Sequence, residues 1–278
     1  MYIIADSGST KVDWRAINEY GSVKGLTTPG INPVFMSEDE IADSFSAKLS
    51  TLPAEEVSAV YFYGAGVVAQ EQKDKIVNCV KRFFPSAECQ VASDMEAAAR
   101  GLCGTEAGIA CIIGTGSNSC FWDGEQITDN VPAGGFILGD EASGAYLGRQ
   151  LISDFIKGLL PTAISQEFNR RFELDYPTVV SKVYKEPKPN AYLASFMPFL
   201  HEFKNHPYVT GMVKSAFEAF ISRNVAHYDF KTYKVSFTGS VAFYFKDILE
   251  KCIVAAGMRP GRICRTPMDG LIEYHKQK

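Results

Sequence analysis

The sequence predicts an α/β protein made of two related domains. Its 278 residues suit either one large α/β unit or two domains of about 100–170 residues. Segments with the apolar pattern of strands alternate with segments that have the pattern of helices, which is typical of α/β folds. A strand–turn–strand pattern also occurs twice, because Gly8 and Trp14 have counterparts 108 positions later, Gly116 and Trp122. Two copies favour paired domains over a solenoid, although chance similarity of two hairpins would look the same.

We place the domain boundary after residue 107. The N-terminal domain then covers residues 1–107 and the C-terminal domain covers residues 108–278. Residues 158–232 are rich in predicted helix and form a helical segment of the second domain, which would shape either a dimer contact or a cleft wall. The C-terminal tail, residues 267–278, could pack back on the first domain.

The first domain begins with a predicted β-hairpin. Residues 2–5 form an apolar strand, and residues 12–16 alternate between apolar and polar as a second strand does. Ser37, followed by Glu40 three positions later, predicts a capping box at the start of a helix over 37–49. The further elements expected are a strand at 57–63, a helix at 70–84, a strand at 89–92 and a helix at 95–102.

The second domain repeats this design. Its expected elements are a strand at 110–113, a small-residue turn at 114–118, a strand at 120–122, a helix at 143–156, the helical segment, a strand at 235–237 and a helix ending near 256.

Composition and charge narrow the class of protein. With 46% hydrophobic and 22% charged residues, the chain has the composition of a globular protein with a full core. Its net charge of −4 gives no reason to expect nucleic acid, whose phosphates attract clustered Lys and Arg. A nucleotide can still bind, because backbone N–H groups and a metal ion supply local positive potential.

Cysteines and histidines predict no metal centre of their own. The seven cysteines contain no C-x-x-C pair, and their odd number indicates reduced thiols. His201 and His206 are five positions apart, so they diverge by about 140° on a helix and are interpreted as surface histidines. No signal peptide is visible, and no apolar run reaches the roughly 18 residues of a spanning helix. We therefore expect a cytoplasmic protein with no membrane partner.

Three predicted strands end in turns of small polar residues, at 6–10, 114–117 and 238–240. Glycine lets a backbone approach an anion, and hydroxyls with exposed N–H groups coordinate phosphate oxygens. One such turn is an ordinary tight turn, whereas three of them, two in the repeated hairpins, favour phosphate binding. The chain has neither a Walker A loop nor the G-x-G-x-x-G pattern of a dinucleotide-binding fold.

These turns resemble the motifs of a known superfamily. ADSGSTK at 5–11 resembles the first phosphate motif of the actin–hexokinase–Hsp70 ATPases, IIGTGSNS at 112–119 the second, and FTGSVA at 237–242 the adenosine motif. GTGSN, the Gly-Gly pair that follows it and GDE before a helix resemble N-acetylglucosamine kinases and the related BadF-BadG-BcrA-BcrD ATPases. The resemblance implies two duplicated ribonuclease-H-like domains of the actin and hexokinase type, with a nucleotide cleft between them.

The resemblance also implies an activity. This is the phosphorylation of an amino sugar, N-acetylglucosamine before others, with ATP and Mg²⁺ as cofactors and the sugar as a small-molecule partner. Asp94 matches the family's catalytic base, which would take the proton of the attacking sugar hydroxyl. Its place between a strand and a helix fits a helix N-cap equally well. Asp6 would hold Mg²⁺ through water, because hard carboxylate oxygens suit that ion.

Further site residues follow from the same motifs. Those expected to face ATP are Gly8, Ser9, Thr10, Lys11, Thr115, Gly116, Gly239 and Ser240. Those expected in the sugar pocket are Asn32, Ser117, Asn118, Gly135 and Asp140. Asn32 could instead be a turn residue before Pro33, and Asp140 with Glu141 could be charges that a helix N-terminus favours. The third motif has a short glycine run and the Gly-Gly to GDE spacing is tight, so the adenine contacts and the exact sugar stay open.

Other functions compete with the kinase. An activator ATPase of 2-hydroxyacyl-CoA dehydratases shares the fold but needs thiolates on exposed loops for an iron–sulfur cluster, whereas Cys103 and Cys111 are expected to be buried. A non-catalytic sugar or nucleotide sensor would not need three carboxylates at Asp6, Asp94 and Asp140. Glucosamine, N-acetylmannosamine and N-acetylmuramic acid are alternative kinase substrates that differ by one substituent. The sequence is compatible with a homodimer.

Overall fold

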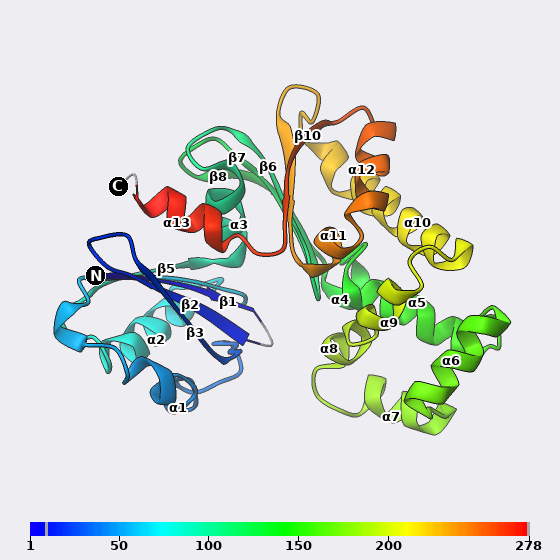
Figure 1. Ribbon diagram of the computed structural model, residues 1–278, viewed down its shortest axis with the longest axis horizontal. Coiled ribbons are helices and arrows are strands. Elements are labelled where there is room, and N and C mark those ends of the chain that lie inside the picture. The colour runs from blue at the N-terminus through cyan, green and yellow to red at the C-terminus, as the bar shows by residue number, and fades with distance from the viewer. Residues whose placement is uncertain (9–10, 277–278) are drawn as a thin grey trace. The chain divides into compact units, whose positions relative to one another are not determined.

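The computed structural model describes residues 1–8 and 11–276, and the chain divides into two compact units (Figure 1). Unit 1 consists of Met1–Gly104 together with the C-terminal segment that begins at Pro267, and unit 2 consists of Thr105–Thr266. Each unit contains a five-stranded sheet. In the part of the chain that the structure describes, no helix combines the length and the apolar character needed to cross a membrane.

The sheet of unit 1 has the strand order β3-β2-β1-β4-β5. Strands β1, β4 and β5 are parallel, while β2 pairs antiparallel with both β1 and β3. Ser7 lies beside Gly64 and Gly64 beside Ser93, so the three parallel strands end together at one edge of the sheet. We call this the carboxyl edge of unit 1. The strands are β1 (Tyr2–Ser7), β2 (Lys11–Ile17), β3 (Val23–Pro29), β4 (Ala59–Gly64) and β5 (Glu88–Ser93).

Helices cover both faces of this sheet (Figure 1). They are α1 (Glu38–Leu49), η1 (Ala54–Glu56), α2 (Gln70–Lys81), α3 (Asp94–Cys103) and α13 (Met268–Lys276). Successive side chains of a strand point to opposite faces. Ile3 therefore packs in one core with Phe45 of α1, and Ile4 packs in another with Leu271 of α13. Burial on both faces explains the unbroken apolar run at the N-terminus.

Helix ends in unit 1 show both predicted and unpredicted features. The capping box is confirmed, because the Ser37 hydroxyl accepts the Glu40 N–H at 3.3 Å and the Glu40 carboxylate accepts the Ser37 N–H at 2.8 Å. The C-terminal tail was expected to pack on the first domain, and α13 does belong to unit 1, but its close backbone contact with α3 was not predicted. A Cβ on Gly270 would lie 1.8 Å from the carbonyl oxygen of Gly101, so the two helix backbones touch there. This contact fixes the position of α3, the helix that begins with Asp94.

The sheet of unit 2 repeats the order of unit 1 as β8-β7-β6-β9-β10. Strand β6 pairs antiparallel with β7 and parallel with β9, as β1 does with β2 and β4. Trp14 and Trp122 are both fully buried. The shared order confirms the predicted fold class and the internal duplication. The strands are β6 (Gly108–Ile113), β7 (Ser117–Trp122), β8 (Ile127–Val131), β9 (Lys234–Thr238) and β10 (Arg259–Cys264).

The helices of unit 2 confirm the predicted helical segment. They are α4 (Gly135–Leu138), α5 (Gly144–Ile156), α6 (Thr162–Phe172), α7 (Tyr176–Tyr184), α8 (Pro189–Ala194), α9 (Met197–Glu202), α10 (Pro207–Arg223), η2 (Val225–His227), α11 (Ser240–Tyr244) and α12 (Lys246–Ala255). Phe168 of α6 lies at the centre of an aromatic cluster, with ring centroids 4.7 Å from Phe155 and 5.3 Å from Phe199. This cluster joins the segment to the core of the unit.

Three strands were not predicted, namely β3, β8 and β10. Each lies at an outer edge of its sheet. Only Thr28 of β3 is buried, and no residue of β8 or β10 is. An exposed edge strand needs little apolar alternation, so periodicity does not reveal it.

Candidate active site

The carboxyl edge of unit 1 brings two carboxylates together. Asp6 lies next to the end of β1, and Asp94 is the first residue of α3, directly after β5. The N-cap of α3 is Ser93, whose hydroxyl accepts the Glu96 N–H at 3.1 Å. The N-cap interpretation of Asp94 is therefore wrong, because the cap is Ser93 and Asp94 is the first helical residue.

The surroundings of both carboxylates disfavour their charged forms. The pKa of Asp6 is raised to about 7, first by burial and then by the charges of Asp94 and Asp13, against the opposing charge of Lys11. Burial also raises the pKa of Asp94, although a hydrogen bond from the Met95 backbone opposes it. A cation bound beside Asp6 would offset this repulsion between carboxylates.

The turn after β1 forms the rim of this site. The Gly8 N–H donates to the Lys11 carbonyl oxygen at 3.0 Å, and the Lys11 side chain is exposed. Within residues 1–8 and 11–276, the buried Ser7 hydroxyl has no hydrogen-bond partner. Such a group is costly unless a ligand, a water molecule or a residue outside the described part of the chain completes it. Ser7 belongs to the predicted phosphate turn at 6–10, although it was not among the residues expected to face ATP. Ser9 and Thr10, both predicted to face ATP, lie outside the described residues.

Asn32 reaches the same edge from the loop between β3 and α1. Its Oδ1 accepts the Val34 N–H at 3.0 Å, which is the hydrogen bond of the turn interpretation. A Cβ on Gly66 would lie only 2.6 Å from this Oδ1, so Asn32 packs against the turn that follows β4. Its predicted role in sugar binding stays a prediction.

In unit 2, the turns after β6 and β9 lie side by side. The Gly114 N–H donates to the Gly116 carbonyl oxygen at 2.9 Å, and the Gly144 N–H at the start of α5 donates to the Gly114 oxygen at 2.7 Å. Gly239 has a φ of 113°, and a Cβ there would lie 2.4 Å from the Ile113 oxygen. Only glycine permits this approach, which brings the second and third predicted motifs together.

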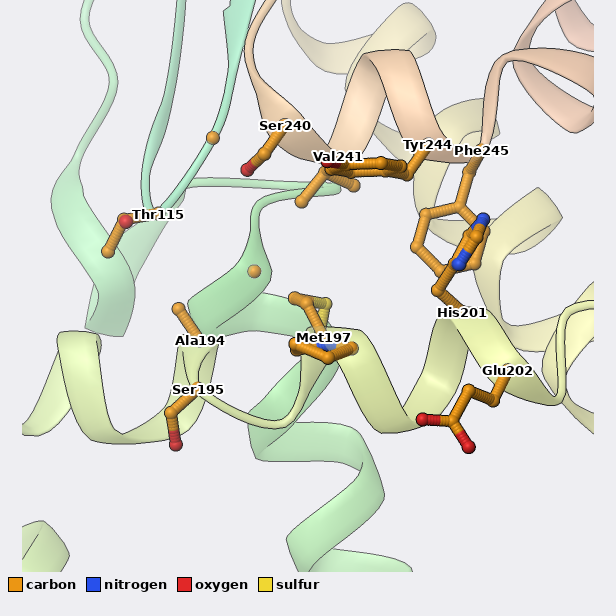
Figure 2. A pocket seen from close by; sticks show the side chains of 13 residues that line it. Thr115, Ala194, Ser195, Met197, His201, Glu202, Ser240, Val241, Tyr244 and Phe245 are labelled. Carbon is orange, nitrogen blue, oxygen red and sulfur yellow. The ribbon is translucent and has the colours of Figure 1, made fainter. Parts of the chain in front are cut away.

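A cavity of about 500 Å³ opens beside these two turns (Figure 2). Thr115 and Ser240 line it next to the turns, and Val241 and Tyr244 of α11 line one side. Met197 faces them from α9, as Figure 2 shows. A largely apolar cavity of this size suits a small organic ligand, with the polar turns fixing one end of it.

Several residues of this cavity were missed by sequence reasoning. His201 was interpreted as a surface histidine, but it lines the cavity and its ring centroid lies 5.2 Å from that of Tyr244. His206 instead caps α10, where its Nδ1 accepts the Tyr208 N–H. The four-residue step from Ser240 to Tyr244, one helical turn, was a signal that could have identified Tyr244.

The loop between β8 and α5, residues 133–142, brings predicted sugar residues to the second motif. Asp140 is 8% exposed, and its Oδ1 accepts the Ser117 N–H at 3.0 Å. Its other oxygen would lie 3.1 Å from a Cβ on Gly116. Gly135 begins α4 in the same loop, whereas Asn118 accepts a hydrogen bond from the Asn130 side chain at 3.1 Å.

Asp140 is not a first-turn charge of α5. That helix has Ser143 as its N-cap and no acidic residue in its first turn, so the macrodipole interpretation of Asp140 and Glu141 is wrong. Burial raises the pKa of Asp140, and the Ser117 N–H opposes this shift. A partly buried carboxylate beside a phosphate-type turn is suited to accept hydrogen bonds from hydroxyl groups.

The expectation about the cysteines is only partly correct. Cys111 is buried in β6, but Cys103 is half-buried at the last residue of α3. All seven cysteines lie in the described part of the chain, and no disulfide joins any of them.

Comparisons with known proteins agree with this architecture. No protein-family model and no curated protein matches the chain. Among solved structures, a Porphyromonas gingivalis protein described as a candidate N-acetylglucosamine kinase is 39% identical, with a TM-score of 0.96 over 100% of this chain and 99% of that chain. The chain belongs to this family of sugar kinases. It is thus a phosphotransferase of the actin-like ATPase superfamily, as the motifs predicted.

More distant structures share the fold of this sugar kinase. A ROK family glucokinase from Streptomyces griseus, solved with glucose and AMPPNP, has a TM-score of 0.59 at 17% identity, over 99% of this chain and 98% of that chain. Component A of (R)-2-hydroxyglutaryl-CoA dehydratase from Acidaminococcus fermentans has a TM-score of 0.51 at 14% identity, over the same shares of the two chains. At these identities the likeness extends to the fold alone.

Proposed function

We propose that this sugar kinase transfers the γ-phosphoryl group of ATP to N-acetylglucosamine, with Asp94 as general base. The observation that carries the proposal is the carboxyl edge of unit 1, where Asp94 opens a helix that Ser93 already caps. A half-buried carboxylate with a raised pKa, beside the acidic Asp6, has the features of a catalytic group. The 39% identical relative described as a candidate N-acetylglucosamine kinase supports this choice of sugar.

The cavity in Figure 2 is the proposed nucleoside site. Val241, Met197 and the ring of Tyr244 offer apolar and aromatic surface for a purine base. The phosphates would then extend toward Thr115 and Ser240, where the turns present backbone N–H groups and hydroxyls. The Streptomyces griseus glucokinase, which has this fold, was solved with the ATP analogue AMPPNP.

The carboxyl edge of unit 1 fits a magnesium ion. Asp6 would supply hard oxygen ligands, and the buried Ser7 hydroxyl is a further polar group there. In residues 1–8 and 11–276, no group of three or more His, Cys, Asp or Glu side chains is arranged to hold a metal. Mg²⁺ would therefore keep much of its water shell, as it prefers to do. When bound, the ion would neutralise charge on the phosphates.

The chemical step assigns a proton to Asp94. A sugar hydroxyl oxygen forms a bond to the γ-phosphorus, the bond from that phosphorus to the β–γ bridging oxygen breaks, and ADP leaves. Asp94 accepts the hydroxyl proton as the oxygen attacks. The remaining acceleration comes from positioning and electrostatics, which are the main resources of phosphoryl-transfer enzymes.

Asp140 is the proposed anchor for the sugar. Its carboxylate is fixed by the Ser117 N–H and lies against Gly116, so it presents acceptor oxygens in a set orientation. Vicinal hydroxyls suit such an acceptor, because each can donate one hydrogen bond. The sequence also predicts sugar contacts at Asn32 and at Gly135, and both predictions are kept in this proposal.

Release of ADP tests the function. Purified protein with Mg·ATP is assayed against N-acetylglucosamine, glucosamine, N-acetylmannosamine, N-acetylmuramic acid and a control without sugar. We expect turnover that depends on sugar and is greatest with N-acetylglucosamine. Hydrolysis that ignores sugar would instead favour an activator ATPase, and binding without turnover would favour a sensor.

A further inference from the structure

The 133–142 loop has a strained backbone. Asp140 and Ala142 have φ values of 52° and 63°, in the left-handed region that non-glycine residues rarely occupy. Gly139 is required by close packing, because a Cβ there would lie 2.1 Å from the Ala133 carbonyl oxygen. Strained residues of this kind persist only where the surrounding structure determines them, and they cluster at functional sites.

Glu141 ties this loop to the end of α10. Its side chain is only 10% exposed, and its Oε1 forms an ion pair with the Arg223 Nε at 2.5 Å. Its Oε2 accepts a hydrogen bond from the Asn224 side-chain amide at 3.4 Å. A buried carboxylate without such partners would be costly, so the position of the loop depends on these two residues.

Ser117 connects Glu141 to Asp140 through two hydrogen bonds. The Ser117 hydroxyl donates to the Glu141 carbonyl oxygen at 2.8 Å, and the Ser117 N–H donates to Asp140 Oδ1 at 3.0 Å. Asp140 and Glu141 are neighbours in the chain, so a shift of the buried Glu141 side chain would turn the strained Asp140 as well.

We propose that Glu141, held by Arg223 and Asn224, is a positioning residue that fixes Asp140 for the sugar. The inference rests on the proposed function, because Asp140 is assigned to the sugar only there. Arg223 is not among the residues that line the nucleoside cavity. A change at Arg223 should therefore leave the affinity for ATP unchanged, while displacement of Asp140 should lower the affinity for the sugar.

The position of Arg223 makes it suitable for substitution. Its side chain is 65% exposed, and it borders an open cavity of about 340 Å³. Shortening it leaves no hole in the core, so Arg223→Ala is expected to fold. Lys214, on the same helix, forms an exposed ion pair with Glu218 at 3.5 Å and serves as the matched control.

The test compares the KM for N-acetylglucosamine with the KM for ATP in Arg223→Ala, Glu141→Gln, Arg223→Lys and Lys214→Ala. Arg223→Ala and Glu141→Gln should each raise the sugar KM about ten- to a hundredfold, as misplacement of a binding group does. The ATP KM should stay within about twofold of that of the unaltered protein, because neither substitution changes a residue that lines the nucleoside cavity. Arg223→Lys keeps a charge and should recover part of the loss, and Lys214→Ala should change neither KM.

Coupling between the two residues provides a second readout. The double variant Arg223→Ala/Glu141→Gln should have a sugar KM no higher than that of the more strongly impaired single variant. Both substitutions remove the same contact, so their effects should not add. An unchanged sugar KM in the single variants would overturn the proposal. An equal rise in both KM values with a lower unfolding midpoint would also overturn it, since that result marks a general loss of structure.

Hydrogen–deuterium exchange separates this inference from the proposed function. If the unaltered protein shows no sugar-dependent turnover, the proposed function fails, and exchange in residues 133–142 then decides whether the tie exists. Exchange in residues 133–142 that is faster than in the unaltered protein for Arg223→Ala, and unchanged for Lys214→Ala, supports the role of the Glu141–Arg223 contact. Equal exchange in both variants refutes it.

Discussion

Asp94 is subject to two opposing effects at the first position of α3. The N-terminus of a helix favours a carboxylate, and the Met95 backbone hydrogen bond expresses this effect. Burial disfavours the charge and is the larger effect, because the pKa of Asp94 is raised. A base that must bind a proton in the transition state is helped by a pKa closer to neutrality.

Replacing Asp94 by Asn should separate binding from chemistry. Asn keeps the size of the side chain but cannot take a proton at neutral pH, so we expect kcat to fall at least about a hundredfold. The affinity for ATP, measured by calorimetry, should be unchanged. Asp39→Asn is the matched control, because Asp39 is also an acidic first-turn residue but lies exposed on α1. A near-normal kcat in Asp94→Asn would remove this residue from the base role.

Thiol reactivity tests the burial of two cysteines. Burial raises the pKa values of Cys79 and Cys89 to about 11, with the Glu38 charge adding to the shift at Cys79. A raised pKa means that the neutral thiol dominates at pH 8 and that the reactive thiolate forms only as the pH approaches 11. Iodoacetamide at pH 8, followed by mass spectrometry, should label both slowly in the folded protein and rapidly in denaturant. Rapid labelling of half-buried Cys89 at pH 8 would contradict the shift.

Helix crossings in unit 2 depend on close backbone contact. Gly148 lies inside α5, and a Cβ there would be 2.0 Å from the carbonyl oxygen of Leu193 in α8. Gly211 lies inside α10, with open space where its Cβ would be. The same residue type therefore has opposite roles in the two helices.

Alanine at these two glycines should change stability in opposite directions. Gly148→Ala overpacks the α5–α8 contact and should lower the free energy of unfolding by about 1–3 kcal/mol. Gly211→Ala meets no neighbour and should raise it by about 0.5–1 kcal/mol, because alanine restricts the unfolded chain and favours the helix. Urea unfolding of the two variants measures both effects. Stabilisation by Gly148→Ala would show that the helices can separate without cost.

Elements with local signals could be predicted, and elements without them could not. The helix with the Ser37–Glu40 capping box was predictable because its start lies in four consecutive residues. Strand β10 was not, since its Pro260 and Gly261 are typical of turns and its edge position requires no apolar alternation. Sequence position alone also could not choose between Ser93 and Asp94 as the cap of α3.

At the scale of the whole molecule, the duplicated fold was predictable because Trp14 and Trp122 mark one repeated hairpin. The motif turns were predictable because each is a short continuous segment of the sequence. The nucleoside cavity was not, because His201 comes from a helical segment without a motif and only the fold brings it to Ser240. Arg223 was missed likewise, since its partner Glu141 is far away in the sequence.

Identification of the reaction product decides whether this sugar kinase phosphorylates N-acetylglucosamine, as we propose. The protein is incubated with Mg·ATP and N-acetylglucosamine, and the sugar is analysed by mass spectrometry and phosphorus NMR. We expect N-acetylglucosamine that carries one phosphoryl group, together with an equal amount of ADP. ADP without phosphorylated sugar, or unchanged ATP and sugar, would contradict it.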